Sequence, residues 1–222
     1  KSYGLGTPVV SEVLHGIHLA VTRGEFVALI GPSGSGKSTL LNIIGLLEGA
    51  TSGSYRIEGD ETSGLTDAEL TLRRRATLGF VFQFHHLLPA FTALENVTLP
   101  ALMREGRVTT AQRERALAVL ASVGLQHAID KRPGELSGGM QQRVALARAF
   151  VTDAPILLMD EPFSALDPLI RTRLQDELLE LQAKLHRTII FVSHDLDEAF
   201  KIGNRIALME GGRIVQCGTA RE

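Results

Sequence analysis

The chain carries Gly31-Pro32-Ser33-Gly34-Ser35-Gly36-Lys37-Ser38 directly after an apolar run at 25–30, and a helical pattern follows at 38–47. The octapeptide matches the P-loop pattern G-x-x-x-x-G-K-[ST] in the strand–turn–helix context that the pattern requires. Its glycines let backbone N–H groups turn toward phosphate oxygens, and the helix N-terminus adds about half a positive charge. The segment therefore predicts a nucleoside triphosphate site, with Lys37 at the β- and γ-phosphates and Ser38 on Mg²⁺. An ordinary glycine–serine turn is the alternative, although average composition produces the full pattern in roughly 1% of chains this long.

A second motif supplies a carboxylate for the metal. The apolar run at 156–159 predicts a buried strand that ends at Asp160, and Glu161 follows at once. Ligands bind beyond the carboxyl ends of strands in open α/β sheets, which places Asp160 where a metal would lie. A helix cap is the alternative for an aspartate at a strand end, but the presence of a P-loop favours the metal role.

Several short apolar runs predict a mostly parallel core sheet that is covered on both faces. The expected strands lie at 25–30, 80–82, 156–159 and 188–192. Two further segments, 54–58 and a hairpin across 210–213, predict antiparallel pairing. Together they predict an α/β fold with a small antiparallel β lobe.

Helix ends can be predicted at several places. Thr66 and Thr109 each begin a capping box, and the helix after Thr109 is expected to end at Gly124. Asp167 begins another helix, in which leucines recur at helical spacing at 174, 178, 181 and 185, and we expect this stripe to pack in the core rather than form a dimer contact. The strand pattern is interrupted between about 87 and 149. We therefore expect one domain, 1–222, with a helical lobe at 87–149 inserted into a core formed by 1–86 and 150–222.

Composition limits the choice of partners. The 222 residues carry a net charge of −2 and are 44% hydrophobic, so a sizeable core can form and no overall positive field favours nucleic acid. The single cysteine, Cys217, excludes an internal disulfide, and we expect it to be a small buried residue. No apolar run reaches the roughly 18 residues needed to cross a bilayer, so a membrane link is expected to come from partner subunits.

The segment Leu136-Ser137-Gly138-Gly139-Met140, followed by Gln141-Gln142-Arg143, resembles the signature motif of the ABC ATPase family, usually LSGGQ. Met140 replaces the usual glutamine. We expect activity to survive this replacement, because Ser137 and the two glycines open a helix that can bind a γ-phosphate through hydroxyl and backbone groups.

The other motifs of that family are matched in order. Gln83 matches the Q-loop glutamine, Glu161 the catalytic carboxylate and His194 the switch histidine. Ser164-Ala165-Leu166-Asp167 matches the D-loop, and Tyr3 is placed like the aromatic residue that stacks on adenine. Taken alone, His194 would fit equally well as a strand-end residue capping the next helix.

The resemblance implies a P-loop NTPase fold that binds ATP and Mg²⁺ and hydrolyses ATP to ADP and phosphate. Glu161, His194 and Lys37 would be the catalytic residues, with Glu161 polarising water and the other two contacting the γ-phosphate. Ser38, Gln83 and Asp160 would hold the metal. The expected ATP-binding residues are Tyr3, Gly31, Pro32, Ser33, Gly34, Ser35, Gly36, Lys37, Ser38, Thr39 and Gln83.

The resemblance also implies the assembly. Two chains would pair head to tail in an ATP-dependent homodimer, so that the P-loop of one chain faces residues 136–140 of the other. Gln83 would report to integral membrane permease subunits, and the chain would lie peripherally at the cytoplasmic face of the inner membrane. Nucleic acid is not an expected partner, because the chain is acidic overall.

Different segments resemble different branches of the family. Residues 83–97 resemble the ATPase of lipoprotein-releasing (Lol-type) transporters, whereas 161–171 and 194–203 resemble ATPases of importers for glycine betaine, proline or choline. We hypothesise a chimera, natural or engineered, joined near 136–143, and one lineage with mixed features is the alternative. Because the Q-loop and helical lobe receive the permease in this family, we expect lipoprotein release, with osmoprotectant import as the alternative.

Other functions are weaker alternatives. A soluble ABC ATPase acting on nucleic acid or ribosomes usually has long coiled coils or two cassettes, and the sequence has neither. A stand-alone P-loop phosphotransferase would not need the motif at 136–140. The pair His85-His86 has no nearby third metal ligand, and the arginines at 73–75 are expected to form a solvated helix face.

Overall fold

The computed structural model describes residues 1–6, 9–164 and 166–219. The chain divides into two compact units, one formed by Lys1–Leu78 with Arg187–Glu222 and the other by Gly79–His186. The helical lobe expected at 87–149 lies within the range of the second unit, and its existence as a separate lobe stays a prediction.

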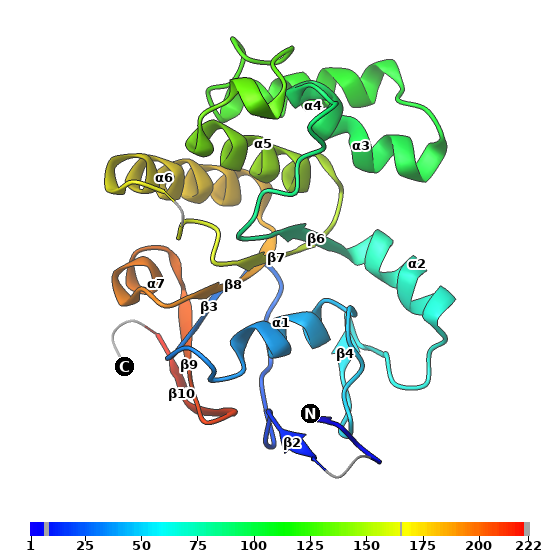
Figure 1. Ribbon diagram of the computed structural model, residues 1–222, viewed down its shortest axis with the longest axis vertical. Helices are drawn as coiled ribbons and strands as arrows, with labels where there is room; N and C mark the ends of the chain where they lie inside the picture. The colour runs from blue at the N-terminus through cyan, green and yellow to red at the C-terminus, as the bar shows by residue number, and fades with distance from the viewer. Residues whose placement is uncertain (7–8, 165, 220–222) are drawn as a thin grey trace. The chain divides into compact units, whose positions relative to one another are not determined.

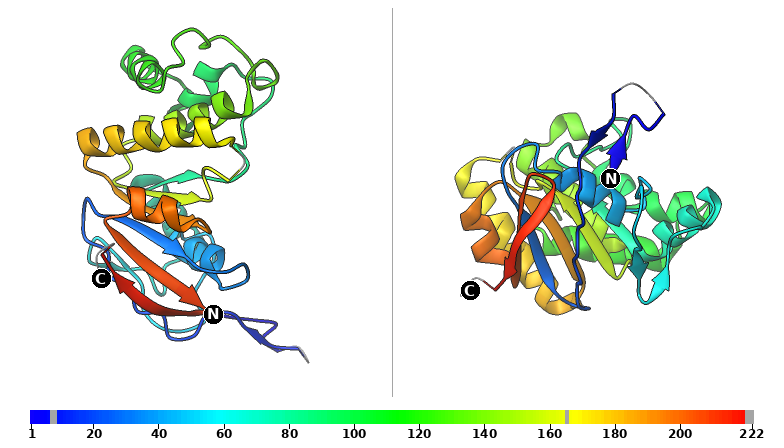
Figure 2. Two further views of the ribbon diagram at one scale, coloured as in Figure 1. Left: turned by 90° about the vertical axis from the view of Figure 1, so that its left-hand side faces the viewer. Right: turned by 90° about the horizontal axis from the view of Figure 1, so that it is seen from below.

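The first unit is built on a sheet in the order β10-β9-β3-β8. Its strands are β3 (Phe26–Ile30), β8 (Thr188–Ser193), β9 (Arg205–Glu210) and β10 (Arg213–Gly218). β3 pairs in parallel with both β8 and β9, and β9 pairs antiparallel with β10, as Figure 2 shows for the blue β3 beside the orange and red hairpin. Every residue of β3 and β8 is buried, which confirms the two apolar runs predicted as core strands.

Short ribbons and helices complete the first unit. The ribbons pair β1 (Ser2–Tyr3) with β2 (Ser11–Glu12) and β4 (Arg56–Ile57) with β5 (Asp60–Glu61), both antiparallel. The helices are α1 (Lys37–Ile44), α2 (Asp67–Thr77) and α7 (Leu196–Ile202). The capping box predicted at Thr66 is confirmed, since its hydroxyl accepts from the N–H of Glu69 and its own N–H donates to the Glu69 carboxylate.

The second unit combines two neighbouring strands with a group of helices. The strands are β6 (Leu78–Val81), which begins at the last residue of the first unit, and β7 (Ile156–Asp160). The helices are α3 (Ala93–Glu105), α4 (Thr110–Ser122), the short 3₁₀ turn Pro133–Glu135, α5 (Gly138–Val151) and α6 (Pro168–Leu185). Helices α3, α4 and α5 pack against one another, in green in Figure 1.

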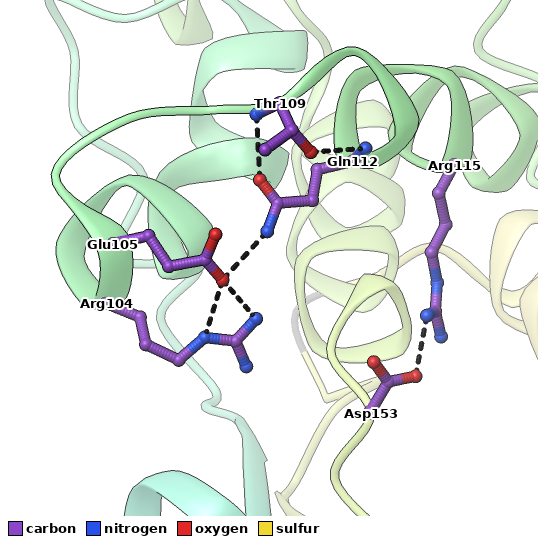
Figure 3. A network of polar contacts seen from close by, with 6 residues as sticks. All are labelled: Arg104, Glu105, Thr109, Gln112, Arg115 and Asp153. Atoms are coloured by element: carbon purple, nitrogen blue, oxygen red, sulfur yellow. Dashed lines mark hydrogen bonds and ion pairs between the residues drawn. The ribbon is translucent and has the colours of Figure 1, made fainter.

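Polar contacts fix the connection between α3 and α4 (Figure 3). The Glu105 carboxylate accepts a hydrogen bond of 2.9 Å from Gln112, and Gln112 also completes the capping box that Thr109 opens. Arg115 of α4 pairs at 2.6 Å with Asp153, in the segment that leads into β7. The capping box predicted at Thr109 is therefore confirmed and is part of a larger network.

The structure corrects the length of α1. The helix was expected over 38–47 but ends at Ile44. The N–H of Gly45 bonds to the carbonyl of Leu41 at 2.8 Å, and Leu46 adopts a left-handed backbone with φ of 54°. A residue in that conformation cannot continue a right-handed helix, so the chain turns away.

Two expectations about burial were wrong. Cys217 is exposed on β10, which among the described residues is the terminal strand of its sheet. Leu185 is 41% exposed at the last residue of α6, whereas Leu174, Leu178 and Leu181 are buried. Helical spacing identified the inward face of α6 and not the point at which the helix leaves the core.

We expect Leu120→Ala in α4 to lower the free energy of unfolding by about 2–5 kcal/mol, because the Leu120 side chain is 0% exposed and its loss leaves a cavity. Met103→Ala on α3, where the side chain is 75% exposed, is the matched control and should change stability by less than about 0.5 kcal/mol. Urea titration followed by circular dichroism measures both. Equal losses in the two variants would contradict the assigned core.

Candidate functional site

The P-loop closes against the main chain of β9. Gly31 has φ of +148°, and a Cβ there would lie 2.1 Å from the carbonyl oxygen of Met209. Gly36 has φ of +96°, and a Cβ there would lie 2.6 Å from the side chain of Leu14. Only glycine satisfies both the backbone angle and the contact at these two positions, so the loop conformation depends on the motif.

Lys37 points back into the loop. Its side chain is buried, and Nζ donates to the carbonyl oxygens of Gly31 at 2.8 Å and Pro32 at 2.9 Å. The N-cap of α1 is Gly36, which provides no side-chain cap, so no cap side chain competes for the N–H groups at the helix start. An ammonium group and a helix N-terminus therefore lie at the same turn.

These donors suit a polyphosphate with its metal. Backbone N–H groups and a lysine bind phosphate oxygens, and the buried Oγ of Ser35 makes no hydrogen bond among the described residues. The Ser38 side chain is exposed, and Mg²⁺ takes most of its oxygen ligands from phosphates and water rather than from an all-protein cage. Within residues 1–6, 9–164 and 166–219, no group of three or more His, Cys, Asp and Glu could hold a metal by itself.

Tyr3 is held at the edge of this unit, close to α1. Its hydroxyl donates to the Glu48 carboxylate at 2.5 Å, which raises the pKa of Tyr3 and lowers that of Glu48. The Lys1 ammonium lies 4.8 Å from the centre of the ring. The ring is 40% exposed, so it is available for stacking next to the helix that starts the P-loop.

His194 follows β8 directly and lies at the same sheet edge as the P-loop. Ser193, the last residue of β8, pairs with Ile30, the last residue of β3, and the two strands are parallel. Asp195 caps α7 by accepting from the N–H groups of Asp197 and Glu198, so the helix has its cap without His194. The sequence-level alternative of a capping histidine is therefore not the observed arrangement.

The segment after β7 is strained. Asp160 ends the strand, and Glu161 has a left-handed backbone with φ of 44°. The carbonyl of Glu161 accepts from the N–H of Ser164 at 3.2 Å and from its hydroxyl at 3.0 Å. A non-glycine residue in this conformation costs of order 1 kcal/mol, and such residues concentrate at functional sites.

The signature residues form the start of α5. Ser137 is the N-cap and accepts from the N–H of Met140 at 3.3 Å, and Gly138 is the first residue of the helix. A Cβ at Gly139 would lie 2.7 Å from Cγ2 of Ile170 in α6, so a larger residue here would require Ile170 to shift. Ser137 and Gly138 are exposed, whereas Leu136 is buried.

The Q-loop and D-loop residues also lie in the second unit. Gln83 is exposed, two residues after the end of β6. Ser164 holds the Glu161 turn, Leu166 is buried, and Asp167 caps α6 with two hydrogen bonds of 3.1 Å from Leu169 and Ile170. Ala165 lies outside the described residues. The first unit therefore holds Tyr3, the P-loop and His194, and the second holds Gln83, the signature, Asp160, Glu161 and the D-loop.

Sequence reasoning missed the residues that support these motifs. The Ser193 hydroxyl donates to the buried Glu198 carboxylate at 2.7 Å and accepts from the N–H of Asp195 at 2.9 Å, on either side of His194. Gln142 is 1% exposed and has partners in two distant segments. The sequence did offer a signal for these supporting residues, because Ser193 and Gln142 are polar and lie beside the motifs at His194 and 136–140.

A P-loop between a buried parallel strand and a helix, followed by ordered motifs at strand ends, defines a nucleotide-binding protein of the P-loop class. The chain belongs to the ABC transporter family, whose profile matches residues 14–164. None of the helices in the described part of the chain is long and apolar enough to span a bilayer.

Relatives in two transport systems resemble the chain to similar degrees. It is 50% identical over 204 residues to the glycine betaine/proline betaine transport system ATP-binding protein ProV of Salmonella typhimurium, covering 92% of this chain and 51% of that protein. It is 46% identical over 215 residues to the lipoprotein-releasing system ATP-binding protein LolD 1 of Rhodopseudomonas palustris, covering 95% and 93%. The chain thus spans about half the length of the first relative.

A solved dimeric bacterial ABC transporter cassette shares the fold, with a TM-score of 0.89 and 40% identity over 100% of this chain and 96% of that one. The same cassette in a dimeric post-hydrolysis state bound to ADP and Pi matches with a TM-score of 0.88. These similarities confirm the predicted fold class.

We expect Gly31→Ala to weaken Mg-ATP binding by about tenfold or more, because the added Cβ would push the P-loop away from Met209. Gly49→Ala is the matched control, since a Cβ there meets nothing within 4 Å, and it should bind like the wild type. Calorimetric titration measures the affinity, and circular dichroism checks that each variant is folded. Wild-type affinity in a folded Gly31→Ala protein would contradict the assigned phosphate site.

Proposed function

We propose that this chain is the ATP-binding and ATP-hydrolysing subunit of an ABC transporter, and that its transporter releases lipoproteins. The observation that carries the proposal is the buried Lys37 in a glycine-dependent loop at the same sheet edge as His194. Family membership and the ADP- and Pi-bound structural relative support ATP hydrolysis as the reaction.

The residues divide the chemistry of hydrolysis. The P-loop, from Gly31 to Thr39, would bind the phosphates while Tyr3 stacks on adenine. Glu161 would orient and polarise the attacking water, and Lys37 and His194 would stabilise charge that develops on the γ-phosphate. Bound Mg²⁺ would neutralise phosphate charge, held by Ser38, Gln83 and Asp160.

ATP would bring two copies of the chain together. The exposed Ser137 and Gly138 at the N-terminus of α5 suit the γ-phosphate of a nucleotide bound to a second chain, and the D-loop would approach it as well. Such a dimer is head to tail, and its closure depends on a phosphate that hydrolysis releases. The dimeric cassettes that resemble this chain support the arrangement.

The second unit presents apolar side chains to a partner. Phe84 is 72% exposed and Leu88 is 41% exposed. Hydrogen bonds fix the backbone of the residues between and beside them. Arg148 donates to the carbonyls of His85 and His86 at 2.8 Å, and the buried Asn96 bonds to both backbone groups of Leu88. Neighbouring exposed apolar residues suit a protein–protein contact, here with a membrane permease.

Lipoprotein release is favoured over osmoprotectant import because the Lol-like residues, 83–97, include this partner-facing segment. Osmoprotectant import remains the second candidate, on the 50% identity to the betaine transport protein. In either case the chain would lie peripherally at the cytoplasmic face of the inner membrane through its permease. The net charge of −2 gives no support for a nucleic acid partner. The chimera, joined near 136–143, stays a hypothesis.

Partner choice is tested by Mg-ATP turnover of the chain reconstituted with a lipoprotein-release membrane complex or with an osmoprotectant permease. We expect stimulation by the first complex alone, because residues 83–97 would contact the permease. Glu161→Gln is the blank and should hydrolyse ATP at least about 100-fold more slowly. Stimulation by the osmoprotectant permease alone would overturn the assignment and favour residues 161–203 as the guide to the biological partner.

A further inference from the structure

One buried amide in the second unit connects two functional segments. Gln142 lies on α5, directly after the signature residues, and its side chain is 1% exposed. Its Nε2 donates to the carbonyl oxygen of Pro162 at 2.5 Å, and its Oε1 lies 2.5 Å from Nδ1 of His85. Because a carbonyl can only accept, the amide orientation is fixed, and His85 must donate from Nδ1.

The His85 end of this link belongs to the Q-loop segment. Arg148, further along α5, donates to the main-chain carbonyls of His85 at 2.8 Å and His86 at 2.8 Å. The segment that begins at Gln83 is therefore tied to α5 through both its backbone and one ring. A movement of His85 would displace or break its hydrogen bond to Gln142. Because the Gln142 side chain is buried, water could not replace the lost partner.

The Pro162 end of the link belongs to the turn that carries Glu161. Glu161 has its left-handed backbone immediately before Pro162, and Ser164 bonds the Glu161 carbonyl from within the turn. Gln142, which lies outside the turn on α5, adds a hydrogen bond to the Pro162 carbonyl oxygen. A strained turn keeps its geometry only where surrounding contacts determine it, so the position of the Glu161 carboxylate depends in part on Gln142.

We propose that Gln142 is a positioning residue that couples the Q-loop segment, through His85, to the turn that presents Glu161. The proposal rests on the proposed function of Glu161 as the hydrolytic carboxylate. A permease bound at the Q-loop segment would then change the rate of hydrolysis through a displacement of the Glu161 turn. Gln142 does not touch the nucleotide in this account.

The kcat and KM of steady-state ATP hydrolysis distinguish a positioning role of Gln142 from a purely structural one. Gln142→Met keeps the length of the side chain and removes both hydrogen bonds, and it should lower kcat for Mg-ATP by about 10- to 100-fold, since small displacements of a reacting group cost this much. KM should stay within about twofold, because uniform binding is unchanged. Gln126→Met makes the same chemical change at an exposed position and is the control.

A double-mutant cycle tests the coupling. His85→Asn keeps an N–H donor close to the position of Nδ1 and should retain most of the wild-type kcat, whereas His85→Leu should lose as much as Gln142→Met. In the Gln142→Met background the two His85 variants should behave alike, because the acceptor is gone. If Gln142→Met does not fold, the contrast between His85→Asn and His85→Leu decides the question alone.

Failure of the coupling and failure of the proposed function would give different results. A normal kcat for folded Gln142→Met, or equal activity of His85→Asn and His85→Leu with native Gln142, would overturn the coupling while leaving the proposed function intact. An equal ratio between the His85 variants in both backgrounds would overturn it as well. Absence of hydrolysis by the wild type, or full activity of Glu161→Gln, would instead overturn the proposed function.

Discussion

The turn from β3 into α1 depends on the close passage of Gly31 beside the main chain of β9. A Cβ at this position would lie 2.1 Å from the Met209 carbonyl, so the chain can follow this path only without a side chain. β9 is held in place by its parallel pairing with β3, in which Ile30 is opposite Leu208. The sheet therefore determines where the phosphate-binding loop can lie, and the direction of Lys37 follows from the loop.

In the second unit the comparable constraint is the left-handed backbone of Glu161. This conformation does not persist by local preference, because it costs free energy in any residue that has a Cβ. Ser164 supports it from within the turn and Gln142 from α5, at Pro162. Under the proposed function the signature helix would serve two purposes: its exposed first residues, Ser137 and Gly138, would bind a phosphate, and Gln142 would hold the turn that carries Glu161.

Local patterns predicted much of this arrangement. The P-loop, the end of β7 at Asp160, the position of His194 directly after β8 and the caps at Thr66 and Thr109 depend on residues within a few positions of one another. Contacts between distant segments were not predictable: Gln142 meets His85 and Pro162, which are 57 and 20 positions away. The exposure of Cys217 on the terminal strand β10 was not predictable, because no periodicity reveals which strand ends the sheet. A resemblance to known motifs, rather than spacing alone, was needed to assign roles to Gln83 and His194.

Under the proposed function, ATP joins two copies of this chain and hydrolysis separates them. Light scattering of Glu161→Gln with and without Mg-ATP tests it most directly, because this variant should bind nucleotide and not consume it. We expect the molar mass to rise with Mg-ATP from 24.0 kDa to about twice that value, and not to rise with Mg-ADP. A mass that stays at 24.0 kDa while ATP is bound would contradict it.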